Sequence, residues 1–240
     1  SSPEPKYLEV NYYDAVFSSI PENLYANKTD NLKLGSFNSC NNLTNIPENL
    51  FKPCINVKEF TNTFKDCKNL ENISENLFKY NTKVSSFSET FIRTKVSNIP
   101  ENLFKYNTEA EDFSGLFAQT NITSIPENLF KFNPLAEEFD EIFDHTKITS
   151  IPENLFKYNT KAKTFKGSFE YCKNLINIPE NLFINNNNIT TMYGIFKYCN
   201  NLTYIPPKII TRALSVPDHE YSFLDCTKAS NYSTLPAELK

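Results

Sequence analysis

The sequence predicts an α/β solenoid with one short parallel strand and one short helix in each unit of 26–27 residues. The main observation is a repeated string, Ile-Pro-Glu-Asn-Leu, which begins at Ile20, Ile46, Ile99, Ile125, Ile151 and Ile178. A variant begins at Ile73, and degenerate copies begin at Ile205 and Leu235. A fixed period of this length indicates stacked repeats, because each unit is too small to bury its own apolar face.

Two further positions of the unit, counted from the isoleucine as position 1, are almost always aromatic. Position 15 holds Phe60, Phe87, Phe113, Phe139, Phe165 and Met192, and position 19 holds Phe64, Phe91, Phe117, Phe143, Phe169 and Phe196. Because these rows recur once per unit, we expect them to stack into one continuous core. The content of 21 Phe and 13 Tyr also excludes an intrinsically disordered chain.

The predicted helix covers positions 2–8. Proline suits the first turn of a helix, and a Ser or Asn before the isoleucine has the spacing of a capping box. Glu and Lys follow four residues apart, as at Glu127 and Lys131, and such pairs stabilise helices. The asparagine at position 9 is expected to be a left-handed C-terminal cap, at Asn81, Asn107, Asn133 and Asn159.

The predicted strand is the short apolar-ended stretch before each isoleucine, for example Leu43 to Ile46 and Leu70 to Ile73. The Phe-x-x-x-Phe segment before it could be a second helical turn, with both rings facing inward. The four glycines all fall at position 17, but Asn or Glu replaces them in other units. A left-handed backbone is therefore not strictly required at that position, and we expect a turn of exposed helix there between the two buried Phe rows.

The repeat also predicts the organisation of the chain as one continuous solenoid domain. Residues 1–19 form an N-terminal half unit, residues 20–204 form seven tandem units, and residues 205–240 form an irregular C-terminal unit with a partial repeat. Irregular ends are expected, because a cap must cover the core at each end of a solenoid.

Composition and charge exclude several classes of function. With 24 Lys+Arg against 28 Asp+Glu and a pI near 5.4, a dedicated nucleic-acid binder is not expected. No apolar stretch is long enough to cross a membrane, and the glycines are too far apart for a phosphate-binding loop. No cofactor is expected, and a zinc site in particular is not expected because no Cys-x-x-Cys pair is present.

The cysteines follow the repeat. Cys40, Cys67, Cys172, Cys199 and Cys226 share position 22, where three units carry Thr instead, and Cys54 stands where Asn usually does. Exchange of Cys with Thr favours small buried side chains with free thiols over disulfides. Disulfides remain the alternative for an extracellular protein.

These motifs resemble those of a known family. The pattern Phe-x-x-Cys-x-x-Leu recurs at Phe37–Leu43, Phe64–Leu70, Phe169–Leu175 and Phe196–Leu202. Over about residues 12–239 the chain resembles the leucine-rich-repeat-like units of BspA-type bacterial surface proteins, and it is similar to the repeat of mycoplasma lipoproteins. The resemblance implies a right-handed leucine-rich-repeat-like array. It also implies an extracellular or cell-surface adhesion module, in bacteria or some protists, that engages host proteins or other cells.

The predicted recognition surface is the variable stretch between the Leu and Ile of each unit, because a row at this place lines one face of a solenoid. The candidate residues are Thr44, Glu71, Ser97, Thr123, Thr149, Ile176, Thr203 and Tyr204. The alternative is a solvated polar surface. The predicted function is non-enzymatic binding of a host or neighbouring-cell protein or glycan. A structural stalk is the alternative, and a glycan-processing enzyme with His219 in the irregular unit is the weakest one.

Two other rows of the repeat are candidate sites. The glutamates at position 3 could collect Ca²⁺, although their spacing to Lys already explains them as helix pairs. The aromatic row at position 8 could bind glycans or protein, although partly buried packing is the favoured interpretation. It consists of Tyr80, Tyr106, Phe132 and Tyr158.

Overall fold

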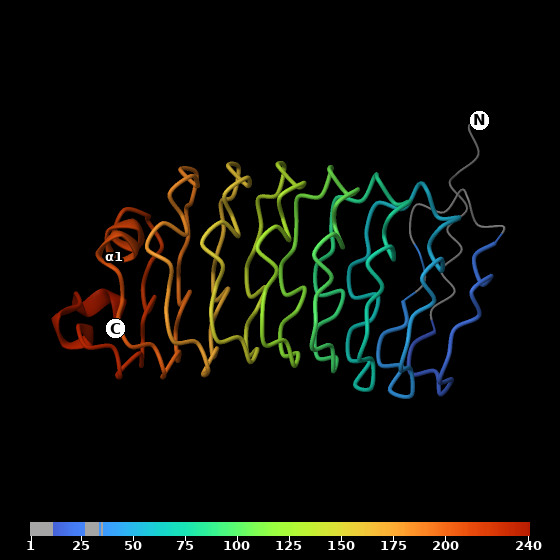
Figure 1. Ribbon diagram of the computed structural model, residues 1–240, viewed down its shortest axis with the longest axis horizontal. Coiled ribbons are helices and arrows are strands. Elements are labelled where there is room, and N and C mark those ends of the chain that lie inside the picture. Colours follow the sequence, from blue (N-terminus) through green and yellow to red (C-terminus); the bar gives the residue numbers. More distant parts are fainter. Residues whose placement is uncertain (1–11, 27–33, 35) are drawn as a thin grey trace.

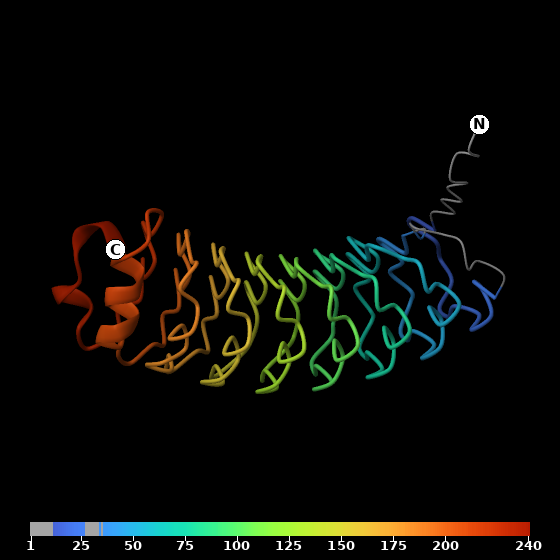
Figure 2. The same cartoon turned by 90° about the horizontal axis from the view of Figure 1, so that it is seen from above.

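The computed structural model describes residues 12–26, 34 and 36–240. Over these residues the chain winds around one long axis, from the N-terminal units to the C-terminal end that carries α1 (Figure 1). Seen from above, the stack of coils is gently curved (Figure 2). Residues 1–11 of the predicted half unit and Gly35 lie outside the described residues.

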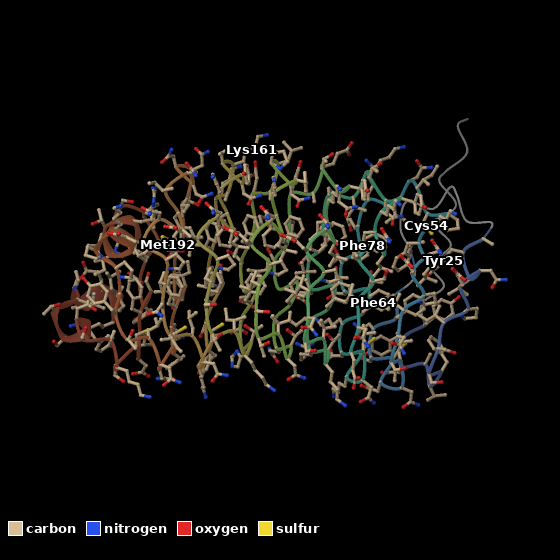
Figure 3. All side chains as sticks on the ribbon, in the orientation of Figure 1. Tyr25, Cys54, Phe64, Phe78, Lys161 and Met192 are labelled. Atoms are coloured by element: carbon tan, nitrogen blue, oxygen red, sulfur yellow. The ribbon has the colours of Figure 1, made fainter. Side chains whose placement is uncertain are left out.

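The core consists of stacked phenylalanine rows, as the repeat predicts. Along position 19, the rings of successive units are nearly parallel, with centroids 5.3–6.0 Å apart. A second row at position 15 and a third at position 6 are buried as well, as for Phe139 and Phe130. Phe64, Phe78 and Met192 lie inside the stack, whereas Lys161 lies at its edge (Figure 3).

The predicted helix at positions 2–8 is wrong. In the unit that begins at Ile125, the backbone N–H of Leu129 donates to Pro126, and that of Lys131 donates to Asn128. These three-residue spacings form successive turns. A segment of seven residues has too little intrinsic helical stability to determine its own backbone, because packing supplies most of the stability of helices in proteins. Lateral contacts with the neighbouring unit therefore determine its backbone.

Helices occur only in the C-terminal unit, within the part of the chain that the structure describes. The α-helix α1 spans Pro207–Leu214, and the short 3-10 helices η1 and η2 span Tyr232–Thr234 and Ala237–Leu239. The backbone N–H groups of Tyr221 and Phe223 donate to the carbonyls of Glu238 and Leu239. The irregular end of the chain therefore supplies acceptors where a further regular unit would.

The asparagines at position 9 are not helix caps, and none of them has a positive φ. They are fully buried, and each Nδ2 donates to two backbone carbonyls of the preceding unit. Asn133, for example, donates to Phe104 at 3.1 Å and to Asn107 at 2.8 Å. The same pattern is found at Asn81, Asn107, Asn159 and Asn186. We call this row the asparagine ladder.

The parallel pairing lies elsewhere than predicted. It consists of isolated bridges at position 14, which join Glu59, Ser86, Asp112, Glu138, Thr164, Thr191 and Asp218 in order. The stretch before each isoleucine that the sequence predicts to be a strand has no assigned strand in any described unit. Neighbouring units are joined there by few backbone hydrogen bonds, such as that from Ile176 N–H to the Thr149 carbonyl, so no regular ladder can form.

The Phe-x-x-x-Phe segment is also not helical, and the expectation for position 17 is wrong. Positions 17 and 21 are left-handed in the units from Ile46 onward, with φ between 53° and 61°. Glu89 and Glu141 adopt this conformation as Gly115 does, despite its cost of about 1–2 kcal/mol for a residue with a side chain. The N–H of Glu89 then donates to Ser114 of the next unit at 2.8 Å. Hydrogen bonds between units therefore impose this backbone.

All six cysteines are buried and free in the structure. At position 22, a cysteine thiol donates to the backbone carbonyl of the position-19 phenylalanine in the preceding unit. Cys172, for example, donates to the Phe143 carbonyl at 3.1 Å. Threonine instead donates within its own unit, as from Thr146 to Phe143 at 2.8 Å. Both residues thus place one small donor beside a core carbonyl, which explains their exchange.

Candidate binding faces

The candidate recognition residues lie in register at the same place in successive units, and together we call them the L-x-x-I row. Seven of the eight side chains are exposed, and Ser97 is half-buried. The backbone beneath them is linked from unit to unit. Ile176 N–H donates to Thr149 at 3.2 Å, and Thr203 N–H donates to Ile176 at 3.1 Å. The structure therefore brings the predicted row together on a fixed scaffold.

The C-terminal end of the L-x-x-I row is its most apolar part. Ile176 and Tyr204 are each 45% exposed. A shallow hollow there is lined by Thr149, Asn174, Ile176, Asn201, Thr203 and Lys228. Exposed apolar side chains within a polar border are typical of protein-binding surfaces.

A second exposed row lies at positions 7 and 8, and we call it the Lys–aromatic row. It consists of Lys52, Lys79, Lys105, Lys131 and Lys157 with Tyr80, Tyr106, Phe132 and Tyr158. The rings are 36–41% exposed, so the expected buried packing is only partial. Each ammonium from Lys79 to Lys131 lies over two rings, that of its own unit and that of the next, at 5.6–6.0 Å from the ring centroids.

The glutamates at position 3 do not form the predicted pairs with these lysines, since no such Nζ–carboxylate distance is within 4.0 Å. Instead, each of the six position-3 glutamates from Glu22 to Glu153 accepts a hydrogen bond from the position-4 asparagine of the next unit, whereas Glu180 faces Lys208. Asn128 Nδ2 donates to Glu101 at 2.9 Å, for example. Because positions 2–8 form turns, Glu and Lys of one unit are not on one helical face. Among the described residues, no group of three His, Cys, Asp or Glu side chains is placed to hold a metal ion.

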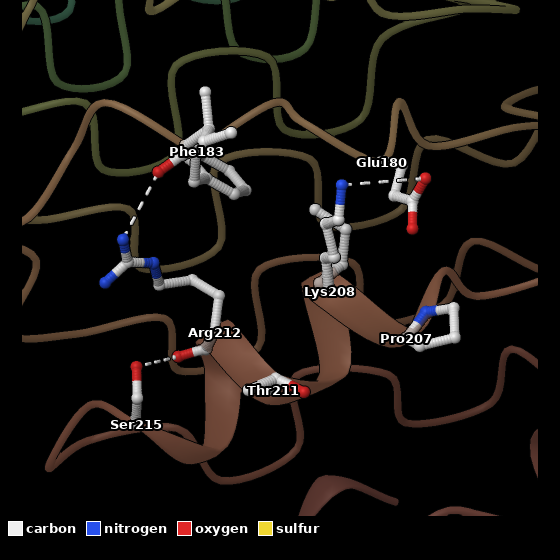
Figure 4. A pocket seen from close by; sticks show the side chains of 9 residues that line it. Glu180, Phe183, Pro207, Lys208, Thr211, Arg212 and Ser215 are labelled. Atoms are coloured by element: carbon white, nitrogen blue, oxygen red, sulfur yellow. Dashed lines mark hydrogen bonds and ion pairs between the residues drawn. The ribbon is translucent and has the colours of Figure 1, made fainter.

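A pocket of about 450 Å³ lies where α1 replaces the regular turns. Phe183, Ile184 and Ile209 contribute its apolar lining, and Lys208 and Arg212 bring cations to it (Figure 4). Arg212 Nη2 lies 3.4 Å from the Phe183 carbonyl, which would be an acceptor for the next asparagine of the ladder. The arginine therefore ends the asparagine ladder.

The two histidines have separate surroundings. Nδ1 of His219 lies 2.6 Å from the Val216 carbonyl, and the neighbouring Asp218 accepts from Thr191, so these two residues do not pair. His145 Nδ1 lies 2.6 Å from Asp144, and its ring stacks on Tyr171 with centroids 4.1 Å apart. Burial raises the pKa of Asp144 to about 6.

Comparison with known proteins gives a likeness of fold. No protein-family model matches the sequence, and no curated protein does. The chain is similar to the crystal structure of the APL1 leucine-rich repeat domain, with a TM-score of 0.51, 11% identity, and coverage of 63% of this chain and 37% of that one. It is also similar to a chain of the Drosophila Toll–Spatzle complex, with a TM-score of 0.51, 15% identity and coverage of 81% and 30%.

A plant peptide hormone receptor, RGFR1 in complex with RGF2, gives a TM-score of 0.50, 16% identity and coverage of 80% of this chain and 36% of that one. The chain thus spans about a third of the length of these proteins. No helix in the described part of the chain could cross a membrane. Together, the stacked units, the buried ladders and these likenesses show that the chain has the fold of a leucine-rich-repeat solenoid.

Proposed function

We propose that the chain is a non-enzymatic binding module that recognises a protein ligand through the L-x-x-I row. The observation that carries this proposal is the row itself, in which side chains of different chemistry stand exposed on a regular backbone. A rigid scaffold that presents variable side chains is the usual arrangement of a recognition surface.

The chemistry of the row supports a protein ligand. Its four threonines and one serine offer short hydroxyl groups that lose little conformational freedom on binding. Ile176 and Tyr204 supply apolar area at one end, and only Glu71 is charged. The low charge of the row and its exposed aromatic ring agree with the depletion of charged residues and the enrichment of aromatic residues at the cores of protein interfaces.

Two of the similar solved structures support the same class of ligand, since they are complexes of Toll with Spatzle and of RGFR1 with RGF2. The resemblance to BspA-type repeats supports a place at a microbial cell surface or in a secreted protein, and an adhesive role there. Labelling of intact cells with an antibody to the chain tests this location, and labelling only after permeabilisation would contradict it.

The binding test uses the whole chain against a panel of purified matrix and cell-surface proteins. We expect the double variant Thr123→Arg with Thr149→Arg to abolish binding of any positive panel member without loss of folding. Thr108→Arg with Thr160→Arg is the matched control, because these threonines are exposed at position 10 and lie outside the L-x-x-I row. Unchanged binding by the first variant would exclude the L-x-x-I row as the interface. Failure of the isolated chain to bind would favour a stalk.

A further inference from the structure

The lysines of the Lys–aromatic row carry positive charge without a carboxylate partner. In the described part of the chain, no acidic oxygen lies within 4.0 Å of any of their five ammonium groups. Their contacts are with ring faces, at 5.5–6.0 Å from the centroids. A ring attracts an ammonium group by its quadrupole but satisfies its N–H donors poorly. These donors therefore remain available to an anion.

The phenol hydroxyls extend the same row of donors. Tyr80, Tyr106 and Tyr158 are 37–41% exposed, and their hydroxyls make no hydrogen bond among the described residues. Because the rings alternate with the ammonium groups, positive charges and neutral hydroxyl donors alternate along the long axis of the solenoid. Phe132 is the one member of this ring row without a hydroxyl.

Acceptors lie beside these donors. Shallow hollows near both ends of the row are lined jointly by position-3 glutamates, position-4 asparagines and position-7 lysines. Glu153, Asn154 and Lys157 line one hollow, and Glu22, Asn49 and Lys52 line the other. In each glutamate–asparagine contact, the glutamate uses Oε1, as Glu127 does toward Asn154 at 2.6 Å. The second carboxylate oxygen can accept from a ligand hydroxyl.

We propose that this edge of the solenoid binds a linear acidic polysaccharide of the uronate type. Its carboxylates would contact the lysines and the phenols, and its hydroxyls would donate to the glutamates. The donors and acceptors repeat once per unit along this edge, where the adjacent position-6 rings of successive units lie 5.9–6.2 Å apart, and the long lysine side chains can adjust to the shorter repeat of a sugar chain. Single-stranded DNA fits less well, because its sugar–phosphate backbone has no free hydroxyl groups along the chain to donate to the glutamates, whereas every uronate residue has them.

The test measures binding of polygalacturonate oligosaccharides to the whole chain by isothermal titration calorimetry. We expect the triple variant K105Q, K131Q and K157Q to weaken binding by at least about tenfold, because three charge contacts are lost. The matched control is K68Q, K147Q and K173Q, which removes the same charge at position 23 and should change affinity by less than about twofold. Binding should also weaken with added salt. The single variant Y106F, which removes only a hydroxyl, should weaken it slightly.

Several outcomes would overturn the proposal. These are no binding of polygalacturonate by the wild-type chain, equal binding of neutral dextran, tighter binding of single-stranded DNA, or equal losses in the two triple variants. The Thr123→Arg and Thr149→Arg variant should bind polygalacturonate as the wild type does. Loss of polygalacturonate binding in that variant would contradict the assignment of the glycan to a separate edge. If the wild-type chain binds polygalacturonate but no protein of the panel, the proposed function is wrong and the glycan site is supported.

Discussion

Substitution of Asn133 by Asp tests the asparagine ladder most sharply. The side chain is fully buried, and its Nδ2 donates to the carbonyls of Phe104 and Asn107. Its Oδ1 has no partner in the structure. Aspartate has nearly the same shape, but it places an oxygen where the amide nitrogen stands. That oxygen would face two carbonyl oxygens and would lack both hydrogen bonds.

The expected cost follows from these contacts. Asn133→Ala removes two hydrogen bonds of about 1 kcal/mol each, so it should destabilise the chain by about 2 kcal/mol. The loss is limited, because the Phe104 and Asn107 carbonyls each also accept a backbone N–H, from Asn107 and Ala110. Asn133→Asp should cost about 3–5 kcal/mol at neutral pH, because it also buries a charge without a partner.

The pH dependence distinguishes charge from shape. Burial would raise the pKa of the introduced carboxyl in the folded state above its unfolded value. The penalty is therefore greatest at neutral pH and shrinks as the pH falls through the raised pKa. Urea unfolding at pH 7 and pH 5 measures both effects, with the exposed Asn185→Asp as the matched control. An Asn133→Asp variant as stable as the control at pH 7 would refute the role of the ladder.

Three further predictions concern the core and its buried groups. Phe139→Ala should lower the free energy of unfolding by about 3–5 kcal/mol in urea titrations, because Phe139 is fully buried between Phe113 and Phe165; a loss below about 1 kcal/mol would contradict the stacked core. Iodoacetamide without reductant should leave Cys172 unmodified in the native chain, since burial raises its pKa to about 12, and should modify all six cysteines after denaturation; fewer would indicate disulfides. Because burial raises the pKa of Asp144, the folded chain binds more protons than the unfolded chain, and the free energy of unfolding should fall as the pH rises from about 4 to 6. Asp144→Asn should reduce this fall in urea titrations, and the same pH dependence in the variant and the wild type would contradict the prediction.

The features that the sequence predicts well are those that recur unchanged in every unit. The rings at positions 15 and 19 must meet their counterparts in a stack, so their burial follows from the period alone. At position 22, Cys in some units is replaced by Thr in others, as Cys172 is by Thr146. This exchange likewise predicts a small buried side chain, and both residues are buried in the structure. The L-x-x-I row lies in one register for the same reason. Its binding role stays a prediction.

The errors come from reading the spacing within one unit as helical. Glu127 and Lys131 are four residues apart, but the partner of Glu127 is Asn154, 27 residues away. Asn133 resembles a helix cap in sequence, although its hydrogen bonds run to the preceding unit. A chain with a period of 26–27 residues places each residue beside its counterpart in the next unit. The recurrence of Asn at position 9 in five successive units was the available signal for a buried ladder.

Repeat excision tests the central claim, that identical units interact only with their neighbours, most directly. Deletion of residues 125–150 joins Ser124 to Ile151 and restores the Ser-Ile-Pro sequence found at the native junction. Asn159 should then donate to the Phe104 and Asn107 carbonyls in place of Asn133. The single measurement is a urea titration of the shortened chain, in which tyrosine fluorescence monitors unfolding. The account predicts a folded protein with one cooperative transition at somewhat lower urea. A chain with no native baseline would contradict it.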